Sequence, residues 1–135
     1  MKFKVLYVFL SFLPLPLFVG CGEKLPYEVV GIRGTITFEG RPAPKGLRLQ
    51  FAPANGMGRT STAFVGEGGK FKAAYTRSVE GIQVGKVILT VGWSTGSDAS
   101  MPSEAVEIIK KFGAATKGLP LEITKPDKEF RIELK

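Results

Sequence analysis

The residue types that most often perform chemistry in proteins are scarce in this sequence. Its 135 residues include no histidine and a single cysteine, Cys21. Without histidine, the chain holds no Ser-His-Asp triad, no Cys-His dyad and no imidazole ligand for a metal. One cysteine excludes an internal disulfide, a thiolate zinc site and a Cys-ligated iron–sulfur cluster. A Ser–Lys pair stays open as a distant alternative, because spacing alone does not show which serine and lysine meet.

Carboxylates and glycine-rich segments provide no stronger candidate site. Glu104 and Glu107 fall about one helical turn apart, and Glu129 and Glu133 share one strand face, but no D-x-D-x-D-G calcium loop is present. We interpret these acids as parts of solvated faces. The Gly-Glu-Gly-Gly run at 66–69 lacks the Gly-Lys-Ser/Thr that completes a phosphate loop. The sequence therefore predicts no catalytic residue, no metal ligand and no cofactor.

The single cysteine lies at the end of an N-terminal apolar run. Lys2 and Lys4 precede this run, and residues 5–20 are interrupted only by one serine and two prolines. The run is shorter than the roughly 20 residues that a membrane-spanning helix needs. A basic start, a short apolar run and the absence of early acids are typical of a secretory signal peptide, so we predict that residues 1–20 are removed.

Residues 18–21, Phe-Val-Gly-Cys, resemble the lipobox of bacterial lipoproteins. The resemblance implies that a signal peptidase cleaves between Gly20 and Cys21, and that Cys21 carries a diacylglyceryl thioether. Acyl chains at Cys21 would anchor the protein durably, because each buried CH₂ group contributes ~0.8 kcal/mol. Gly22 stands where an aspartate favours inner-membrane retention, so the same resemblance implies the outer membrane, on its periplasmic or surface face.

The rest of the chain reads as a short polar tether at 21–28 and one domain at 29–135. Glycine and proline are spread between apolar stretches, which indicates turns. Apolar and polar residues alternate in seven stretches, and this predicts an all-β, seven-stranded antiparallel sandwich. The expected strands are residues 30–38, 47–52, 60–65, 70–76, 87–93, 119–123 and 129–134.

Individual strands carry further expectations. Gly34 lies on the core-facing side of the first strand, where it makes room for a neighbour or a bulge. Apolar residues fill both sides of residues 87–93, which indicates a central strand. The glycines at 66–69 predict a hairpin turn. Charged residues protect two expected edge strands, namely Lys70 and Lys72 on one, and Glu129, Arg131 and Glu133 on the other.

One short helix is expected at residues 103–112. Ser103 suits its N-terminal cap, two lysines suit its last turn and Gly113 suits its end. Val106, Ile109 and Phe112 are expected near its buried face.

Three segments, in this order, resemble the carboxypeptidase regulatory-like, transthyretin-like domains. Residues 31–53 read GIRGTITFEGRPAPKGLRLQFAP and are similar to the G-x-V-x-x-G-x-P strand-turn and following strand of that family. Residues 63–75 read AFVGEGGKFKAAY and resemble its T-D-x-x-G-x-F segment. Residues 84–93 read VGKVILTVGW and resemble its P-G-x-Y-x-V-x-V strand. Residues 111–135 resemble the end of short planctomycete-type lipoproteins that carry one such domain.

The resemblance implies a prealbumin-like sandwich in the cell envelope and supplies no catalytic residue. A hydrolase of purine breakdown shares this fold, but its activity depends on histidines and a C-terminal Tyr-Arg-Gly-Ser. This chain has neither, so we do not expect that activity.

The sequence says less about the partners of this protein than about its location. Trp93 is the lone tryptophan, and it ends the strand at 87–93 beside the polar residues 94–102. An aromatic there offers a platform for a sugar, although its parity with Val87, Leu89 and Val91 favours the core. The net charge of +7, to which the leader contributes two, suits solubility or contact with an anionic envelope surface. Export argues against nucleic acid.

Together these observations predict a lipid-anchored, non-enzymatic protein of the cell envelope. Cys21 attaches it to the membrane, and the sandwich acts as a structural or adhesion module that engages a protein or glycan partner. The alternative is a transthyretin-like carrier that binds a small ligand as an oligomer.

Overall fold

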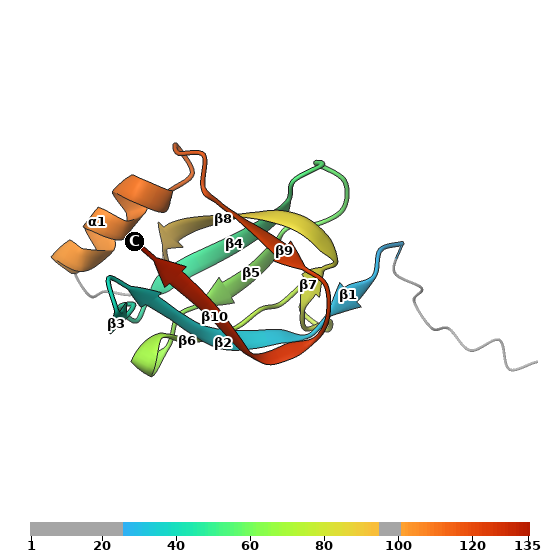
Figure 1. Cartoon of the computed structure of the whole chain (residues 1–135), viewed down its shortest axis with the longest axis horizontal. Coiled ribbons are helices and arrows are strands. Elements are labelled where there is room, and N and C mark those ends of the chain that lie inside the picture. The colour runs from blue at the N-terminus through green and yellow to red at the C-terminus, as the bar shows by residue number, and fades with distance from the viewer. Residues whose placement is uncertain (1–25, 95–100) are drawn as a thin grey trace, which may run out of the picture.

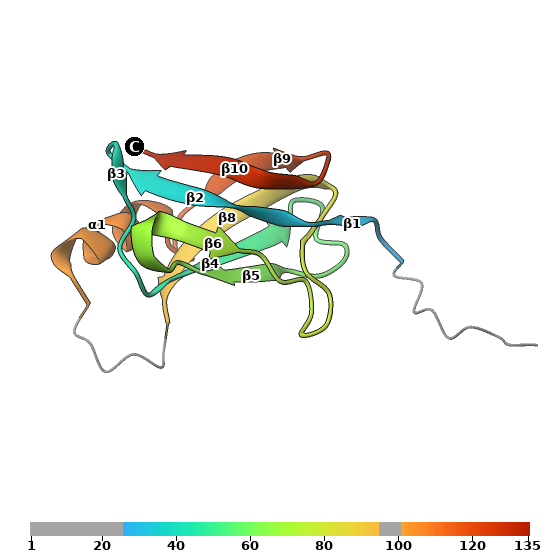
Figure 2. The ribbon, with the colours of Figure 1, turned by 90° about the horizontal axis from the view of Figure 1, so that it is seen from below.

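A computed structural model describes residues 26–94 and 101–135. Within them, two main sheets pack against each other and α1 lies at one end of the pair (Figure 1). Seen from below, the strands of both sheets run roughly along the long axis of the molecule (Figure 2). The elements are β1 (Val29–Val30), β2 (Ile32–Phe38), β3 (Arg41–Pro42), β4 (Leu47–Pro53), β5 (Ser61–Phe64), a 3-10 turn η1 (Glu67–Gly69), β6 (Lys70–Lys72), β7 (Ile82–Gln83), β8 (Gly85–Trp93), α1 (Ser103–Phe112), β9 (Leu119–Ile123) and β10 (Asp127–Leu134).

The first main sheet has the order β10-β2-β3, with β6 also paired to β2. The second has the order β5-β4-β8-β9, so β8 is a central strand, as its two apolar sides predict. A separate antiparallel pair joins β1 to β7. The short strands β3 and β7 lie between strands that the sequence predicts and were not themselves predicted.

The core lies between the two main sheets and follows the period-2 pattern of their strands. In β2, Ile32, Ile36 and Phe38 are buried, which confirms the expected core side of this strand. Matching inward residues on β4 and β8 complete the core from the second sheet, namely Leu47, Leu49, Phe51, Val87, Leu89 and Val91.

The C-terminal strand departs from the expected antiparallel sandwich, because β10 pairs with β2 in parallel. The physical reason lies in the chain path. Residues 124–126 carry the chain from the end of β9 in the second sheet to the start of β10 in the first. That crossing reaches the first sheet at the end where β2 also begins, so both strands run in the same direction. Both β10 and β6 lie at sheet edges, in agreement with their charged residues.

The glycine-rich residues 66–69 turn the chain as expected, and the segments on either side of them meet at one antiparallel bridge, Thr62–Ala74. The rest of their pairing is with other strands. β5 pairs with β4, whereas β6 pairs with β2, so η1 carries the chain from one sheet to the other. Gly68 and Gly69 have φ of 71° and 74°, a region that residues with a side chain rarely adopt. The predicted turn is therefore confirmed, whereas the predicted hairpin is reduced to a single bridge because each flanking strand pairs mainly with another strand.

Helix α1 has the bounds that the sequence predicts, but two details differ. Its N-cap is Pro102, without a side-chain hydrogen bond, so Ser103 is not the cap. Val106 is 38% exposed, whereas Ala105 and Ile108 are buried. The buried stripe runs through residues 105, 108, 109 and 112, because this spacing aligns side chains on one helical face. Gly113 ends the helix as expected, and its N–H donates to the Ile109 carbonyl at 2.7 Å.

Candidate anion-binding face

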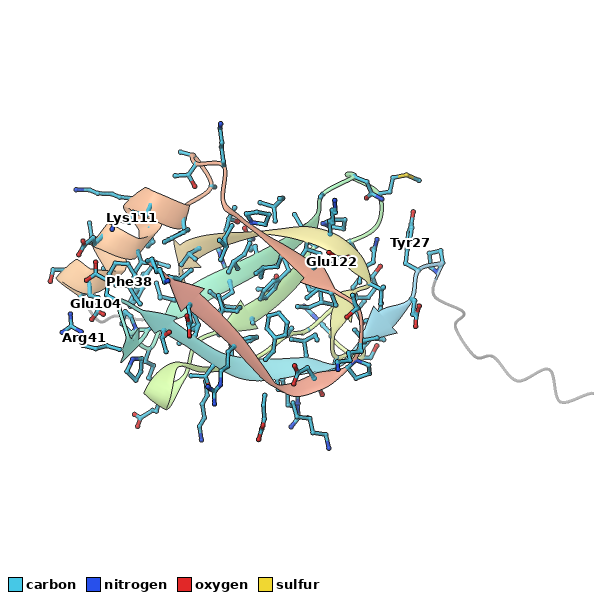
Figure 3. The ribbon with its side chains drawn as sticks, in the orientation of Figure 1. Tyr27, Phe38, Arg41, Glu104, Lys111 and Glu122 are labelled. Atoms are coloured by element: carbon cyan, nitrogen blue, oxygen red, sulfur yellow. The ribbon has the colours of Figure 1, made fainter. Side chains whose placement is uncertain are left out.

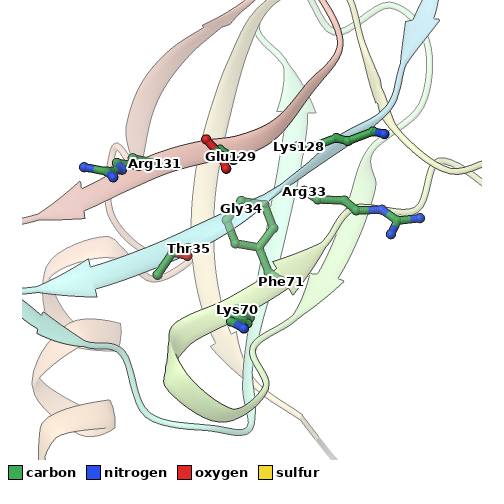
Figure 4. A pocket seen from close by; sticks show the side chains of 8 residues that line it. All are labelled: Arg33, Gly34, Thr35, Lys70, Phe71, Lys128, Glu129 and Arg131. Carbon is green, nitrogen blue, oxygen red and sulfur yellow. The ribbon is translucent and has the colours of Figure 1, made fainter.

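The outer side of the first sheet carries a group of charged residues on neighbouring strands. Strands β6, β2 and β10 are neighbours there, and side chains extend outward from this sheet (Figure 3). Their outward-facing side chains form what we call the basic face, most of which is labelled in Figure 4. It comprises Arg33, Thr35, Lys70, Lys72, Lys128, Glu129 and Arg131, and Glu133 follows at its edge beside Thr37.

Strand register sets the spacing of this face. Thr35 is paired with Lys70 on one side and with Arg131 on the other. Adjacent strands lie about 4.8 Å apart, so the Cα atoms of Lys70 and Arg131 are separated by roughly 10 Å. Arg33 pairs with Lys72 in the next row of the same face. One row therefore places a cation on each side of Thr35, and the next row places Arg33 of β2 beside Lys72.

A bulge in β10 shapes one edge of this face. The register with β2 shifts between Asp127 and Phe130, so β10 holds one extra residue there. The Asp127 Oδ1 atom accepts a 2.8 Å hydrogen bond from the Glu129 N–H, which stabilises the bulge. As a result, consecutive residues Lys128 and Glu129 are both exposed beside β2.

Gly34 is the position that lets β10 approach β2. A Cβ atom there would overlap the Phe130 carbonyl oxygen and lie 2.6 Å from the carbonyl carbon. The expected role of Gly34, space for a neighbour beside a bulge, is thus confirmed. Below the face, Phe71 is 5% exposed and its ring centroid lies 6.1 Å from that of Phe51 in the core.

These residues enclose an open hollow of about 510 Å³ (Figure 4). Gly34, Thr35 and Phe71 contribute to its lining at the centre, and basic side chains surround them. A hollow lined by the Thr35 hydroxyl and by several cations offers hydrogen-bond donors to an anion. Glu129 is the single acid among its lining residues.

Glu80 neutralises one part of the face. Its carboxylate accepts two hydrogen bonds from Arg33, at 2.6 Å from Nε and 3.1 Å from Nη2, and lies 3.4 Å from the Lys72 Nζ. The hydrogen bond from Arg33 lowers the pKa of the Glu80 carboxyl, and the same bond raises the pKa of Arg33. Both groups therefore stay charged together over a wide range of pH.

The remaining cations have no such partner. Among residues 26–94 and 101–135, no carboxylate lies within 4.0 Å of the charged nitrogens of Lys70, Lys128 or Arg131. These three groups are therefore available to a ligand, and two of them flank Thr35. The arrangement is suited to binding carboxylate, sulfate or phosphate groups, and it places no activated nucleophile at the hollow.

The structure also places one of the residues singled out from sequence. Trp93 is half-buried, packs against the hydrophobic core and lies over Gly46. It belongs to β8 in the second sheet, so it is not brought to the basic face. Gly20 and Cys21 lie outside the described residues, as do residues 95–100 of the polar loop.

Sequence reasoning found the charges of the basic face but not the face itself. It interpreted Lys70, Lys72 and Arg131 as protection of separate edge strands. They come together because β6 and β10 pair with opposite sides of β2, and this pairing joins residues far apart in the chain. Basic residues occupy outward-facing positions on three of the expected strands, and this pattern was the available signal for a charged face.

Comparisons with known proteins provide no functional assignment. No family model, no curated protein and no solved structure matches the chain. In the part of the chain that the structure describes, no three acidic or cysteine side chains gather to hold a metal ion. Across residues 26–94 and 101–135, no helix has the length and apolar content to cross a membrane.

Proposed function

We propose that this protein is a lipid-anchored, non-enzymatic binding module of the bacterial cell envelope. Acylated Cys21 holds it in the membrane, a transthyretin-like sandwich forms its body, and the basic face binds an acidic polysaccharide. The leader and the cysteine at its end support the anchor. The observation that supports the ligand class is a set of three cations without a carboxylate partner among the described residues, namely Lys70 and Arg131 beside Thr35, and Lys128 in the bulge of β10.

The chemistry of these cations favours carboxylate or sulfate groups. Arg131 presents a planar set of donors that matches a carboxylate, and the two lysines act as mobile point charges. The Thr35 hydroxyl between Lys70 and Arg131 adds a donor and an acceptor of the kind that sugar hydroxyls use. Export removes nucleic acid from the available polyanions, which leaves acidic glycans as the polymers that the envelope offers.

The shape of the face favours a polymer over a single small ligand. The cations are spread over two rows of an open sheet surface and do not surround an enclosed cavity. A chain with repeated negative groups can contact both rows at once, and its contacts add through effective concentration. An isolated small anion would meet only one row.

A matched pair of double variants tests the ligand-binding part of the proposal. In the first, Lys70→Gln and Arg131→Gln remove two cations from the basic face. In the control, Arg41→Gln and Lys117→Gln remove two exposed cations elsewhere. Both proteins are the full chain, and binding to polygalacturonate is measured by titration calorimetry at fixed ionic strength.

We expect the first variant to bind about tenfold more weakly, because two charge-assisted contacts together contribute at least about 1.4 kcal/mol. The control should bind like the wild type. Equal losses in both double variants would show that only net charge matters, and absence of wild-type binding to acidic glycans would contradict the ligand class.

A further inference from the structure

The end of the sandwich at which β1 begins gathers three loops. Residues 54–60 link β4 to β5, residues 73–81 link β6 to β7, and residues 124–126 link β9 to β10. All three lie near β1, and α1 occupies the opposite end of the molecule (Figures 1 and 2). We call this the tether end, because residue 26, where the described chain starts, is part of it.

The loop at 54–60 holds an exposed apolar side chain in a fixed place. Met57 is 59% exposed, one of the most exposed large apolar side chains in the described part of the chain. Gln83 is buried beneath the loop, where its Nε2 donates to the Met57 carbonyl at 2.9 Å and its Oε1 accepts the Arg59 N–H at 3.3 Å. Asn55 Oδ1 also accepts the Met57 N–H, at 2.9 Å. The backbone that presents Met57 is thus anchored from inside the protein.

Gly58 allows this anchoring. Its φ is +105°, and a Cβ atom there would overlap the Gln83 side chain. Gln83 is itself fixed, because it pairs with Val29 of β1. The loop and the start of the domain are therefore one connected structure, which orients Met57 relative to the tether.

Each of the three loops carries one basic residue, namely Arg59, Arg77 and Lys125. The loop at 73–81 also contains an acid, Glu80, whose charge is paired with Arg33 and Lys72. Asp127 follows the loop at 124–126 and accepts the Glu129 N–H. Glu28 is an exposed acid at this end. Beside Arg59, a hollow of about 430 Å³ is lined by Tyr27 and Tyr75.

The distance from a lipid on Cys21 to this end is short, and this step rests on the proposed function. Four residues separate Cys21 from Pro26. Even fully extended, the five Cα–Cα steps between them span at most about 18 Å. If Cys21 is acylated, the tether end must stay within that distance of the headgroups, whereas α1 lies at the far end of the molecule.

We propose that the tether end docks on an anionic phospholipid surface. Met57 enters the boundary between headgroups and acyl chains, and Arg59, Arg77 and Lys125 lie among the lipid phosphates. The strands then run away from the membrane, so that the basic face on the outer side of β6, β2 and β10 stays open to a glycan. The lipid on Cys21 attaches the protein to the membrane, and the contacts of the three loops set its orientation on the membrane surface.

The test attaches the lipid chemically and so does not depend on processing in the cell. Because Cys21 is the only cysteine, a maleimide-bearing phospholipid couples to it alone in a chain that starts at Cys21. All the buried core residues of the described chain lie between Val30 and Leu134. Removal of residues 1–20 thus takes away none of these core residues. Circular dichroism of each protein verifies that it is folded.

The coupled protein is placed on vesicles of phosphatidylcholine and phosphatidylglycerol that carry brominated chains, and tryptophan quenching is measured. Met57→Trp reports on the tether end. Phe64→Trp is the matched control, since Phe64 is 60% exposed and pairs with Arg48 at the other end of β4. The wild type supplies the baseline from Trp93 alone, which also lies toward the α1 end.

We expect Met57→Trp to lose about half of its added emission and to shift to the blue, because interfacial side chains enter about 5–10 Å into the bilayer. Phe64→Trp should match the baseline. Equal quenching of the two variants would overturn the proposed orientation. So would an absence of quenching in Met57→Trp when flotation shows that the protein is bound to the vesicles. Failure of the native chain to acquire a lipid on Cys21 would instead count against the proposed function. The quenching test is independent of that result, because its lipid is attached chemically.

Discussion

Replacement of Gly34 by alanine should separate β10 from β2 and destabilise the domain strongly. The added Cβ would lie 2.6 Å from the Phe130 carbonyl carbon and 2.9 Å from its nitrogen, closer than the 3.0 Å that real Cβ atoms respect. The obstacle is backbone, so no side-chain rotation relieves it. β10 must move away from β2, or Phe130 must leave the ladder.

The size of the effect follows from what β10 contributes. Beyond Phe130, its Ile132 and Leu134 are 2% and 1% exposed, and both sit in register with β2. Full burial of such a side chain contributes about 1.5–3 kcal/mol. Partial loss of both, with overpacking at the glycine, gives a destabilisation of about 3 kcal/mol.

Urea unfolding followed by far-ultraviolet circular dichroism measures this difference. A loss of about 3 kcal/mol lowers the melting temperature of a domain of this size by roughly 10–20 °C. Gly31→Ala is the matched control, because no atom lies within 4 Å of the position its Cβ would take. A Gly34→Ala protein within about 0.5 kcal/mol of that control would refute the close approach of β10 to β2.

Three further predictions concern single side chains. Glu80→Gln should strengthen binding of a sulfated polysaccharide at neutral pH, because it releases Arg33; unchanged affinity in calorimetry would speak against the neutralising role of Glu80. Since the pKa of Glu80 is lowered by that hydrogen bond, its contribution to stability is present above the unfolded pKa and is lost as pH falls through the folded pKa. The melting temperatures of wild type and Glu80→Gln should therefore converge once the pH is below the folded pKa of Glu80, which lies under the ordinary glutamate value. Ser61→Ala should leave stability unchanged or raise it by up to about 1 kcal/mol, because the buried Ser61 Oγ has no hydrogen-bond partner among the described residues; a loss larger than that in urea unfolding would show that the hydroxyl is satisfied. Gly46→Ala should lower the free energy of unfolding by about 1–3 kcal/mol and shift Trp93 emission to the red, because the φ of Gly46 is +103° and the indole lies 2.7 Å from the added Cβ. An unchanged emission spectrum would contradict this packing.

Local features of the fold were predictable because they depend on neighbouring residues. The alternation in β2 identified its buried side, and the helix bounds followed from residues at both ends of 103–112. Gly34 was identified as a close approach from its parity alone. On α1, Ile109 and Phe112 belong to the buried stripe as expected, but Val106 does not, because packing of the helix buries Ala105 and Ile108 instead.

Pairing between distant strands was not predictable from those local signals. Nothing in the sequence of β10 distinguishes a parallel partner from an antiparallel one, since the choice depends on where residues 124–126 cross between sheets. The basic face depends on the same pairing. Its cations became a candidate site only when β2 was seen to lie between β6 and β10.

The central claim is that Cys21 anchors this protein in the envelope, and an intact mass tests it most directly. The full chain, expressed with its own leader in a bacterium, is extracted with detergent and compared with Cys21→Ala. Our account predicts a mass equal to residues 21–135 plus acyl groups, partition into the detergent phase, and loss of both in the variant. An unprocessed chain, or a soluble protein with a free thiol at Cys21, would contradict it.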